Sequence, residues 1–159
     1  MRLLAIVFIA VITSVVGCNN TADPTHAVAQ ANATNLQRLA NLYFAYQMDN
    51  STFQGPADET TFKKFIQNFD VEKLKRVGID PSAVDTLFIG DRDGEPFKIR
   101  YGVVGSVMGS TEPVIFEATG VGGQRLVGFL NMSQREVDET EYETLWAGKG
   151  AIAAPTRVN

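Results

Sequence analysis

The chain has 159 residues, of which 14 are lysine or arginine and 18 are aspartate or glutamate, and its formal net charge is −4 at pH 7. An acidic surface repels phosphate backbones, so we expect no nucleic-acid partner. The single cysteine excludes a disulfide within the chain. The single histidine, His26, stands in a polar stretch with nothing to orient it, so we expect no catalytic triad, no zinc or other metal site and no cofactor.

A short apolar leader opens the chain. Arg2 is its only charged residue, and the apolar run that follows ends before Asn19–Asn20. A membrane-spanning helix needs about 20 apolar residues, whereas a basic start followed by a shorter apolar run is typical of a signal peptide. We therefore predict that residues 1–17 are a signal peptide and take no part in the fold.

The leader ends in Val15-Val16-Gly17-Cys18. This stretch resembles the lipobox of bacterial lipoproteins, and the resemblance implies cleavage between Gly17 and Cys18, diacylglycerol on the Cys18 thiol and an acyl chain such as palmitate on the new amino terminus. Each buried CH₂ group contributes roughly 0.8 kcal/mol, so several acyl chains give stable anchoring. Asn19 in place of aspartate favours the outer membrane, with the head facing the periplasm or the exterior. The alternative is a secreted protein with an incidental cysteine.

A spacer and a long helix follow the cysteine. Residues 18–27 are small and polar, which indicates a flexible spacer between the lipid and the domain. Leu36, Leu39 and Tyr43 then recur at helical spacing and form one apolar stripe. This stripe predicts a helix over Val28–Met48.

Two shorter helices are predicted next. The first covers about residues 59–69, with either Asp58 or Thr60 as its N-cap. The second covers Val71–Val77 and closes at Gly78 in a left-handed conformation. The first of these helices carries an aromatic stripe that we expect in the core rather than in a ligand site: Phe62, Phe65 and Phe69.

The pattern changes to strands after residue 90. Apolar and polar residues alternate over residues 96–103, and two apolar stretches, 112–120 and 124–131, are joined by a glycine-rich hairpin turn at Gly120–Gly123. Asp138 is expected to cap a last helix that ends at Trp146. Residues 147–159 are expected to be a flexible tail.

This order of elements predicts one domain over residues 28–146. Helices come first and antiparallel strands follow, so the fold class is α+β.

Three stretches in this domain carry a family resemblance. They are NLYFAYQMDNSTFQGPADETTFKKFI, DRDGEPFKIRYG and GVGGQRLVGFLNMSQREVDETEYETL, within about residues 35–146. Their order resembles pilin-like proteins: a Tyr-rich helix end and a turn with proline, the hairpin of type II secretion G-type pseudopilins, and a Gly-rich last hairpin. The resemblance implies a long N-terminal helix and short helices packed on a small antiparallel sheet.

The chain departs from that family at its start. Pseudopilins keep a long apolar helix that packs in the filament, whereas here the apolar segment precedes the expected cleavage point. We therefore expect a lipid-tethered head that does not polymerise into filaments.

Two short segments are similar to known ligand-binding loops, one for calcium and one for phosphate. An EF-hand calcium loop starting at Asp91 would need glycine at Pro96 and a carboxylate at Gly102, so Asp91–Glu95 is predicted to be a simple turn. Pseudopilins of the G type bind calcium through a later loop, which has no match here. The Gly-rich segment 120–125 lacks the Lys-Ser/Thr pair of a phosphate-binding loop, so a hairpin turn is expected.

One catalytic function remains as an alternative, and it would use a pair of carboxylates. Paired carboxylates can hydrolyse glycosides, and the candidates are Glu112, Glu117 and Asp138, with Arg100 or Arg125 beside them in a cleft. None has a distinguishing sequence context.

We therefore expect no catalytic residues and a non-enzymatic, lipid-anchored envelope protein. Its head is expected to be a structural or protein-interaction module that meets an envelope partner, with an exposed strand edge as the first candidate surface. The alternatives are a tethered ligand-binding or carboxylate-based hydrolytic domain, and a head that only occupies the membrane surface. The oligomeric state stays open.

Overall fold

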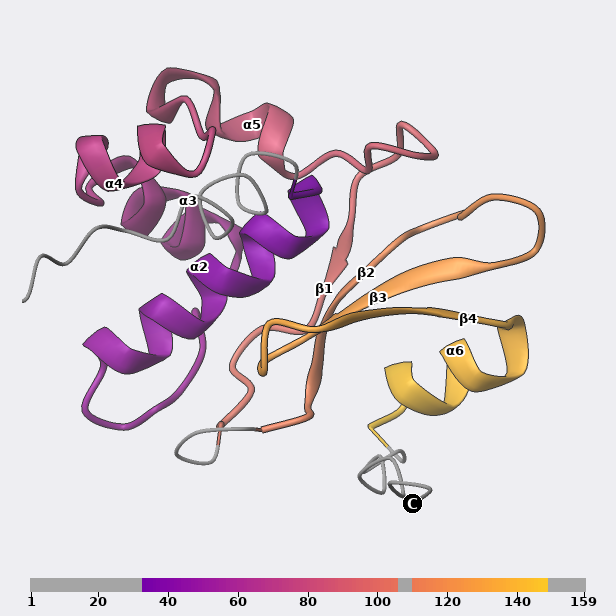
Figure 1. Cartoon of the computed structure of the whole chain (residues 1–159). Coiled ribbons are helices and arrows are strands. Elements are labelled where there is room, and N and C mark those ends of the chain that lie inside the picture. Colours follow the sequence, from indigo (N-terminus) through magenta and orange to yellow (C-terminus); the bar gives the residue numbers. More distant parts are fainter. Residues whose placement is uncertain (1–32, 106–109, 149–159) are drawn as a thin grey trace, which may run out of the picture.

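The computed structural model of the protein describes residues 33–105 and 110–148. The expected signal peptide, the Gly17–Cys18 cleavage site, His26 and the spacer lie outside the described residues, as does most of the expected tail. The described elements run in the order helices, strands, helix (Figure 1). They are α2 (Asn35–Asp49), α3 (Glu59–Gln67), α4 (Val71–Arg76), the 3₁₀ helix η1 (Pro81–Ala83), α5 (Val84–Leu87), β1 (Lys98–Ile99), β2 (Pro113–Phe116), β3 (Arg125–Phe129), β4 (Gln134–Val137) and α6 (Glu139–Trp146).

Helix α2 begins at Asn35, later than the predicted Val28. Thr34 is extended and forms a capping box with Gln37: its side chain accepts a hydrogen bond from the Gln37 N–H, and the Gln37 side chain accepts one from the Thr34 N–H. This box satisfies backbone donors that the first turn leaves unpaired, which fixes the helix start. The spacing of apolar residues does not by itself predict such a cap.

Replacing Thr34 by alanine is expected to lower the free energy of unfolding by about 1 kcal/mol, because the cap is lost. The Thr34 hydroxyl also donates to the Gln134 side chain at 3.1 Å, so the same change loosens β4 from α2. Urea unfolding measures the loss. The matched control is Thr60→Ala, since Thr60 is exposed inside α3 and is not its cap; an equal loss in both variants would contradict the assignment of the cap.

The next helices match their predicted signals. Asp58 is the N-cap of α3, and its carboxylate accepts the Thr61 N–H at 2.7 Å. Asp70 caps α4 in the same way. The chain leaves α4 through Gly78, whose φ of 72° is the left-handed conformation expected there.

The four strands form one antiparallel sheet in the order β1-β2-β3-β4. The α+β class is therefore confirmed. The strand predicted over residues 96–103 was too long, because only Lys98–Ile99 pairs with β2. Beyond it, the Val103 carbonyl accepts hydrogen bonds from the Gly55 N–H and the Gln47 side chain, so this part of the chain bonds to α2 and its following loop instead.

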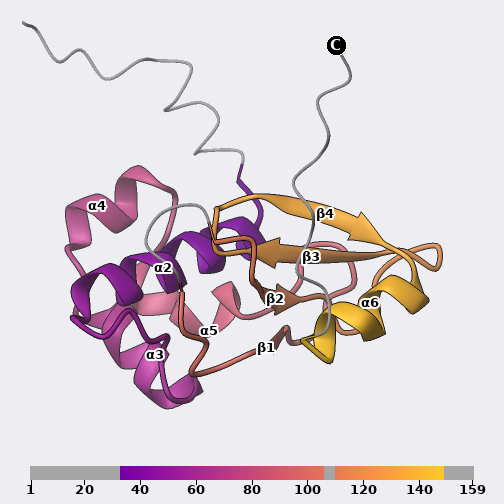
Figure 2. The same ribbon diagram turned by 90° about the horizontal axis from the view of Figure 1, so that it is seen from below.

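Helices cover both faces of the sheet (Figures 1 and 2). Along β3 and the residue after it, Leu126 and Leu130 join the core on the α2 side, whereas Val127 and Phe129 join the core on the α6 side. Gly128 lets α2 approach closely, since a Cβ there would lie 2.7 Å from Leu36 Cδ2. Successive side chains of β3 thus point to opposite faces of the sheet and pack into two separate cores, one on each face.

Tyr43 joins α2 to the end of β1. Its ring is fully buried and meets Phe62 edge to face at 5.7 Å. Its hydroxyl donates to the Arg100 carbonyl at 2.8 Å and accepts the Val103 N–H at 3.2 Å. Burial raises the pKa of Tyr43 to about 12. Gly55 packs against this hydroxyl, where a Cβ would lie 2.0 Å from the oxygen.

Candidate functional site

The Asp91–Glu95 segment is a turn, as predicted. The Gly90 N–H donates to the Glu95 carbonyl, and Gly94 has a φ of 70°. The carboxylates of the turn accept hydrogen bonds from backbone groups of other elements: Asp91 from the Asn35 N–H at 2.6 Å, and Asp93 from the Thr119 and Gly120 N–H groups at the turn end of the β2–β3 hairpin. The turn therefore fastens the hairpin and α2 together.

These bonds set the charge state of Asp93. Partial burial opposes ionisation, but the N–H groups of Gly120, Thr119 and Glu95 outweigh it and lower the pKa of the Asp93 carboxyl. Within residues 33–105 and 110–148, no group of three or more His, Cys, Asp or Glu side chains could hold a metal ion.

Glu117 is the one fully buried carboxylate among the described residues. It accepts the Leu126 N–H at 2.7 Å, and its other oxygen lies 3.4 Å from Arg92 Nε. Arg92 also pairs with Glu136 on β4. Burial raises the pKa of Glu117, although the Leu126 N–H and Arg92 act in the opposite direction. These contacts bind β2, β3, β4 and the Asp91–Glu95 turn into one cluster.

The other candidate catalytic groups have partners of their own. Glu112 lies 3.6 Å from Arg100, whose guanidinium also donates to the Pro113 carbonyl. Arg125 pairs with Glu139 at 2.7 Å and stacks over the Tyr142 ring. Asp138 caps α6, as predicted. Each candidate thus holds secondary structure together, and none of these contacts assembles a carboxylate pair around a cleft.

The glycine-rich segment 120–124 forms the predicted hairpin turn. Gly120, Gly122 and Gly123 all have positive φ, which suits a tight turn. A Cβ at Gly120 would lie 2.3 Å from the Gln124 carbonyl oxygen, so the turn has no room for a side chain there. Val121 at its tip is half exposed.

The sheet has two edges, β1 and β4, and nothing in the structure shows whether either is the expected interaction surface. On β4, the side chains are bonded within the molecule: Gln134 with Thr34, Arg135 with Glu141 and Glu136 with Arg92. Charged residues on a short edge strand oppose the addition of another strand.

An apolar groove runs along the outer side of α2. Its inner section, of about 280 Å³, lies between α2, α4 and the β3–β4 turn, and its outer section, of about 560 Å³, lies between the ends of α2 and α3. The inner section is lined among others by Leu42, Ala45, Phe69, Leu74, Val77 and Met132. The outer section is lined among others by Ala45, Met48, Asp49, Phe65, Asn68 and Asp70. Ala45 and Phe69 belong to both sections, so we treat the two as one groove.

The expectation for the aromatic stripe is confirmed for Phe62, which is fully buried in the core. Phe65 and Phe69 pack against the same core, but they are only partly buried and also line the groove. The helical period placed all three on one face without distinguishing the core from its edge. The sequence carries no signal for Met132, because this residue stands in a turn between two strands.

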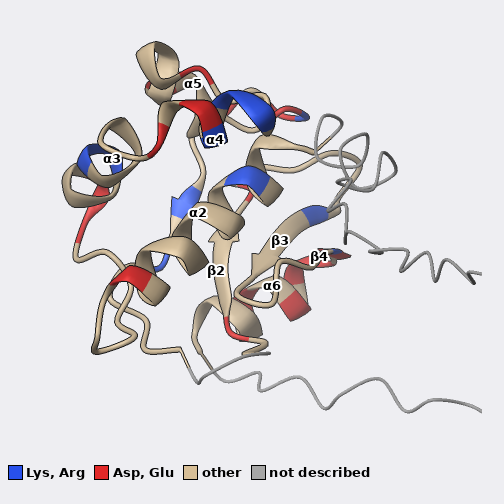
Figure 3. Cartoon of the chain, turned by 60° about the vertical axis from the view of Figure 1, so that its left-hand side comes forward, with Lys and Arg blue, Asp and Glu red and all other residues tan. Residues whose placement is uncertain are grey.

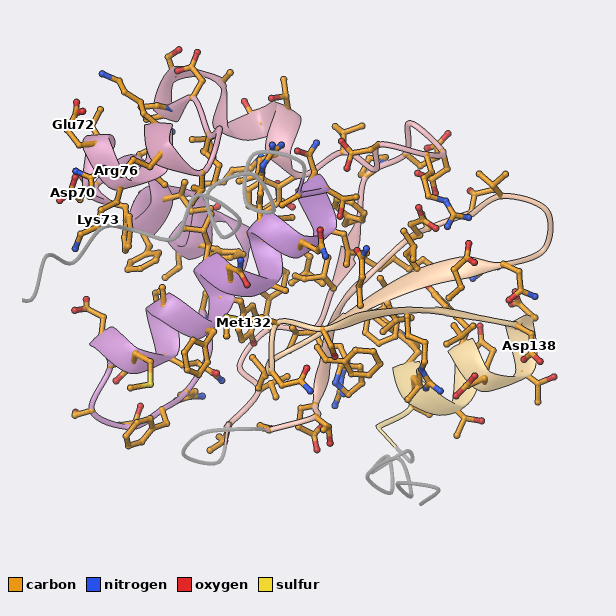
Figure 4. The ribbon with its side chains drawn as sticks, in the orientation of Figure 1. Asp70, Glu72, Lys73, Arg76, Met132 and Asp138 are labelled. Carbon is orange, nitrogen blue, oxygen red and sulfur yellow. The ribbon has the colours of Figure 1, made fainter. Side chains whose placement is uncertain are left out.

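Met132 is an unusual residue for its position. It lies on the β3–β4 turn beside the groove (Figure 4), its side chain is 52% exposed and its φ is 65°. The left-handed conformation costs a bulky residue roughly 1–2 kcal/mol, whereas asparagine and glycine tolerate it. Met132 thus combines an exposed apolar side chain with a strained backbone at the rim of the groove.

Replacing Met132 by asparagine is expected to raise the free energy of unfolding by up to about 1 kcal/mol, because the backbone strain is relieved. Thermal unfolding measures the gain. A clear loss of stability would show that Met132 serves the fold instead.

Comparison with known proteins finds no matching family model, no similar curated protein and no similar solved structure. No helix of the described residues is long and apolar enough to cross a membrane.

Proposed function

We propose that this protein is a lipid-anchored lipoprotein of the bacterial cell envelope whose pilin-like head is a non-enzymatic protein-interaction module. The groove along α2 is the observation that carries the proposal. Its lining is mainly apolar, and its rim exposes Met48 (51%) and Met132 (52%) to solvent. Methionine adapts its shape to an apolar partner surface, so such a rim suits binding.

The position of the groove suits a tethered head. Ala33, the first described residue, lines the inner section. Ala33 is fifteen residues after Cys18, so the two residues can lie at most about 50 Å apart when the chain between them is fully extended. A lipid on Cys18 would therefore keep the groove within reach of partners at the membrane surface.

The carboxylates support binding over hydrolysis. A glycosidase needs two carboxylates about 5–10 Å apart that face a substrate. Here Glu117 is buried against the Leu126 N–H and Arg92, and Asp138 is an N-cap. These residues have structural roles that account for them.

Site-specific photocrosslinking in whole cells tests the proposal. A photoreactive amino acid at Ala45, in the groove, is expected to capture one defined envelope protein. The same probe at Val121, on the exposed hairpin tip, is the matched control and is expected to capture none. Equal adducts at both positions, or none at Ala45, would contradict the proposed role of the groove.

The tether is tested with the same probe. Cys18→Ser should release the protein from the membrane and abolish the Ala45 adduct. An undiminished adduct in this variant would show that binding needs no lipid anchor.

A further inference from the structure

The two sections of the groove differ in charge. Lys73 and Arg38 lie along the inner section, and Asp49 and Asp70 lie along the outer section. Basic and acidic residues therefore stand close together around the start of α4 (Figures 3 and 4). A partner that fits the groove meets a positive region followed by a negative one.

Three of these charged residues have no ion-pair partner within the described part of the chain. The ion pairs there include none of Asp49, Asp70 and Lys73. Asp70 uses one carboxylate oxygen, Oδ1, to cap α4. Glu117, Arg92 and Arg125, by contrast, are all engaged in pairs. Asp49 and Lys73 are thus not held in an ion pair within the residues that the structure describes.

The backbone around the groove selects the conformation of the partner. The groove lies against α2, α3 and α4, whose interior N–H and C=O groups are bonded within each helix. An extended peptide lying there would find no strand edge to pair with, and its own buried N–H and C=O groups would lack partners. A helix satisfies these groups internally and presents only side chains.

The groove also has the length of a short helix. From Arg38 to Asp49, α2 advances about 16 Å at 1.5 Å per residue. About eleven residues of a partner helix, or three turns, cover that distance. Apolar side chains at every third or fourth position would then lie over Leu42, Ala45 and Phe69.

We infer that the groove binds an amphipathic helix of a partner protein, with a basic side chain toward Asp49 and Asp70 and an acidic side chain toward Lys73. This inference rests on the proposed interaction function and adds the class of partner. Paired charges of opposite sign flanking an apolar stripe give specificity, because a like charge at either position is repelled. The two charges on the partner face the same side of its helix, one toward Lys73 and the other toward the acidic end of the groove.

Three synthetic helical peptides test the inference. All carry the same leucine stripe and differ only at two positions, seven residues apart on the groove-facing side: one peptide has Glu and Lys, one has two Glu, and one has two Lys. Binding to the full mature protein in nanodiscs is measured by fluorescence anisotropy, with empty nanodiscs subtracted. The Glu/Lys peptide is expected to bind about tenfold more tightly than either of the others.

Charge reversal then changes the order of affinity. Asp49→Lys should make the two-Glu peptide the tightest, and Lys73→Glu should make the two-Lys peptide the tightest. Both variants are expected to keep their helices stable, because each new charge interacts favourably with the helix dipole. Asp49→Lys puts a basic group at the C-terminus of α2, and Lys73→Glu puts an acidic group in the first turn of α4. Ala45→Arg should abolish binding of all three peptides, and Val121→Arg should leave it unchanged.

The outcomes separate this inference from the proposed function. If Ala45 crosslinks a cellular partner but the peptides show no charge order, the groove function stands and the charged-helix inference is wrong. If the peptides bind only after residues 22–31 are deleted, the occupant is this chain itself. If the protein sediments as a dimer that Ala45→Arg dissociates, the occupant is a second copy. Either of the last two results overturns the inference.

Discussion

Tyr43→Ala is expected to lower the free energy of unfolding by about 3–5 kcal/mol, the largest effect we expect from a single substitution here. The change leaves a cavity beside Phe62 and removes the hydroxyl that bridges the Arg100 carbonyl and the Val103 N–H. The end of β1 would then lose its link to α2. Urea unfolding monitored by fluorescence or circular dichroism measures the loss.

Two further variants separate the ring from the hydroxyl. Tyr43→Phe keeps the ring but leaves two partly buried polar groups without their partner, so a loss of about 1–3 kcal/mol is expected. Tyr46→Phe is the matched control, because the Tyr46 ring is only partly buried and packs on Phe65. If Tyr43→Phe were as stable as the wild type, the hydroxyl bridge would not hold β1 in place.

Glu117→Ala is expected to cost about 1–3 kcal/mol, because the Leu126 N–H loses its buried acceptor. Arg92 keeps Glu136 as a partner, which limits the loss. Glu136→Ala is the control at the exposed end of the same cluster and should cost less than about 1 kcal/mol. A larger loss for Glu136→Ala would contradict the assignment of Glu117 as the centre of the cluster.

Glu117 also gives stability a specific pH dependence. Burial raises its folded-state pKa above the ordinary glutamate value, so the folded protein binds a proton more readily than the unfolded chain. The contribution that proton binding by Glu117 makes to the free energy of unfolding is therefore complete below the ordinary glutamate pKa. It is lost as pH rises through the folded-state pKa of Glu117. Relative to Glu117→Gln, which cannot ionise, the wild type should gain stability as pH falls from 7. Parallel curves for the two proteins would contradict the raised pKa.

Much of the fold follows from local signals in the sequence. Asp138 marked one helix start and the pair Asp58 or Thr60 marked another, and the structure shows that Asp58 is the cap. Gly78 and the Gly120–Gly123 turn marked reversals, because caps and tight turns depend on a few residues close in sequence. Strand β4 was missed, since three of its four residues are polar and its pairing with β3 depends on contacts far along the chain.

The groove could not be found from the sequence for a related reason. Its lining comes from α2, α3, α4 and the β3–β4 turn, and no single stretch carries a pattern for it. Phe65 and Phe69 share a helical face with the buried Phe62, so periodicity treats all three as core. The Glu117 cluster is similar, because Arg92 and Glu136 are far from Glu117 in the chain.

The proposed role of the groove presupposes a head held at the membrane by Cys18. The intact mass of the protein purified from membranes tests this most directly, together with fragmentation of its N-terminal peptide. The expected mature chain begins at Cys18 and is heavier than residues 18–159 by a diacylglycerol group, with or without a further acyl chain. An unmodified Cys18 with a free thiol, or a chain that retains residues 1–17, would contradict the lipid anchor.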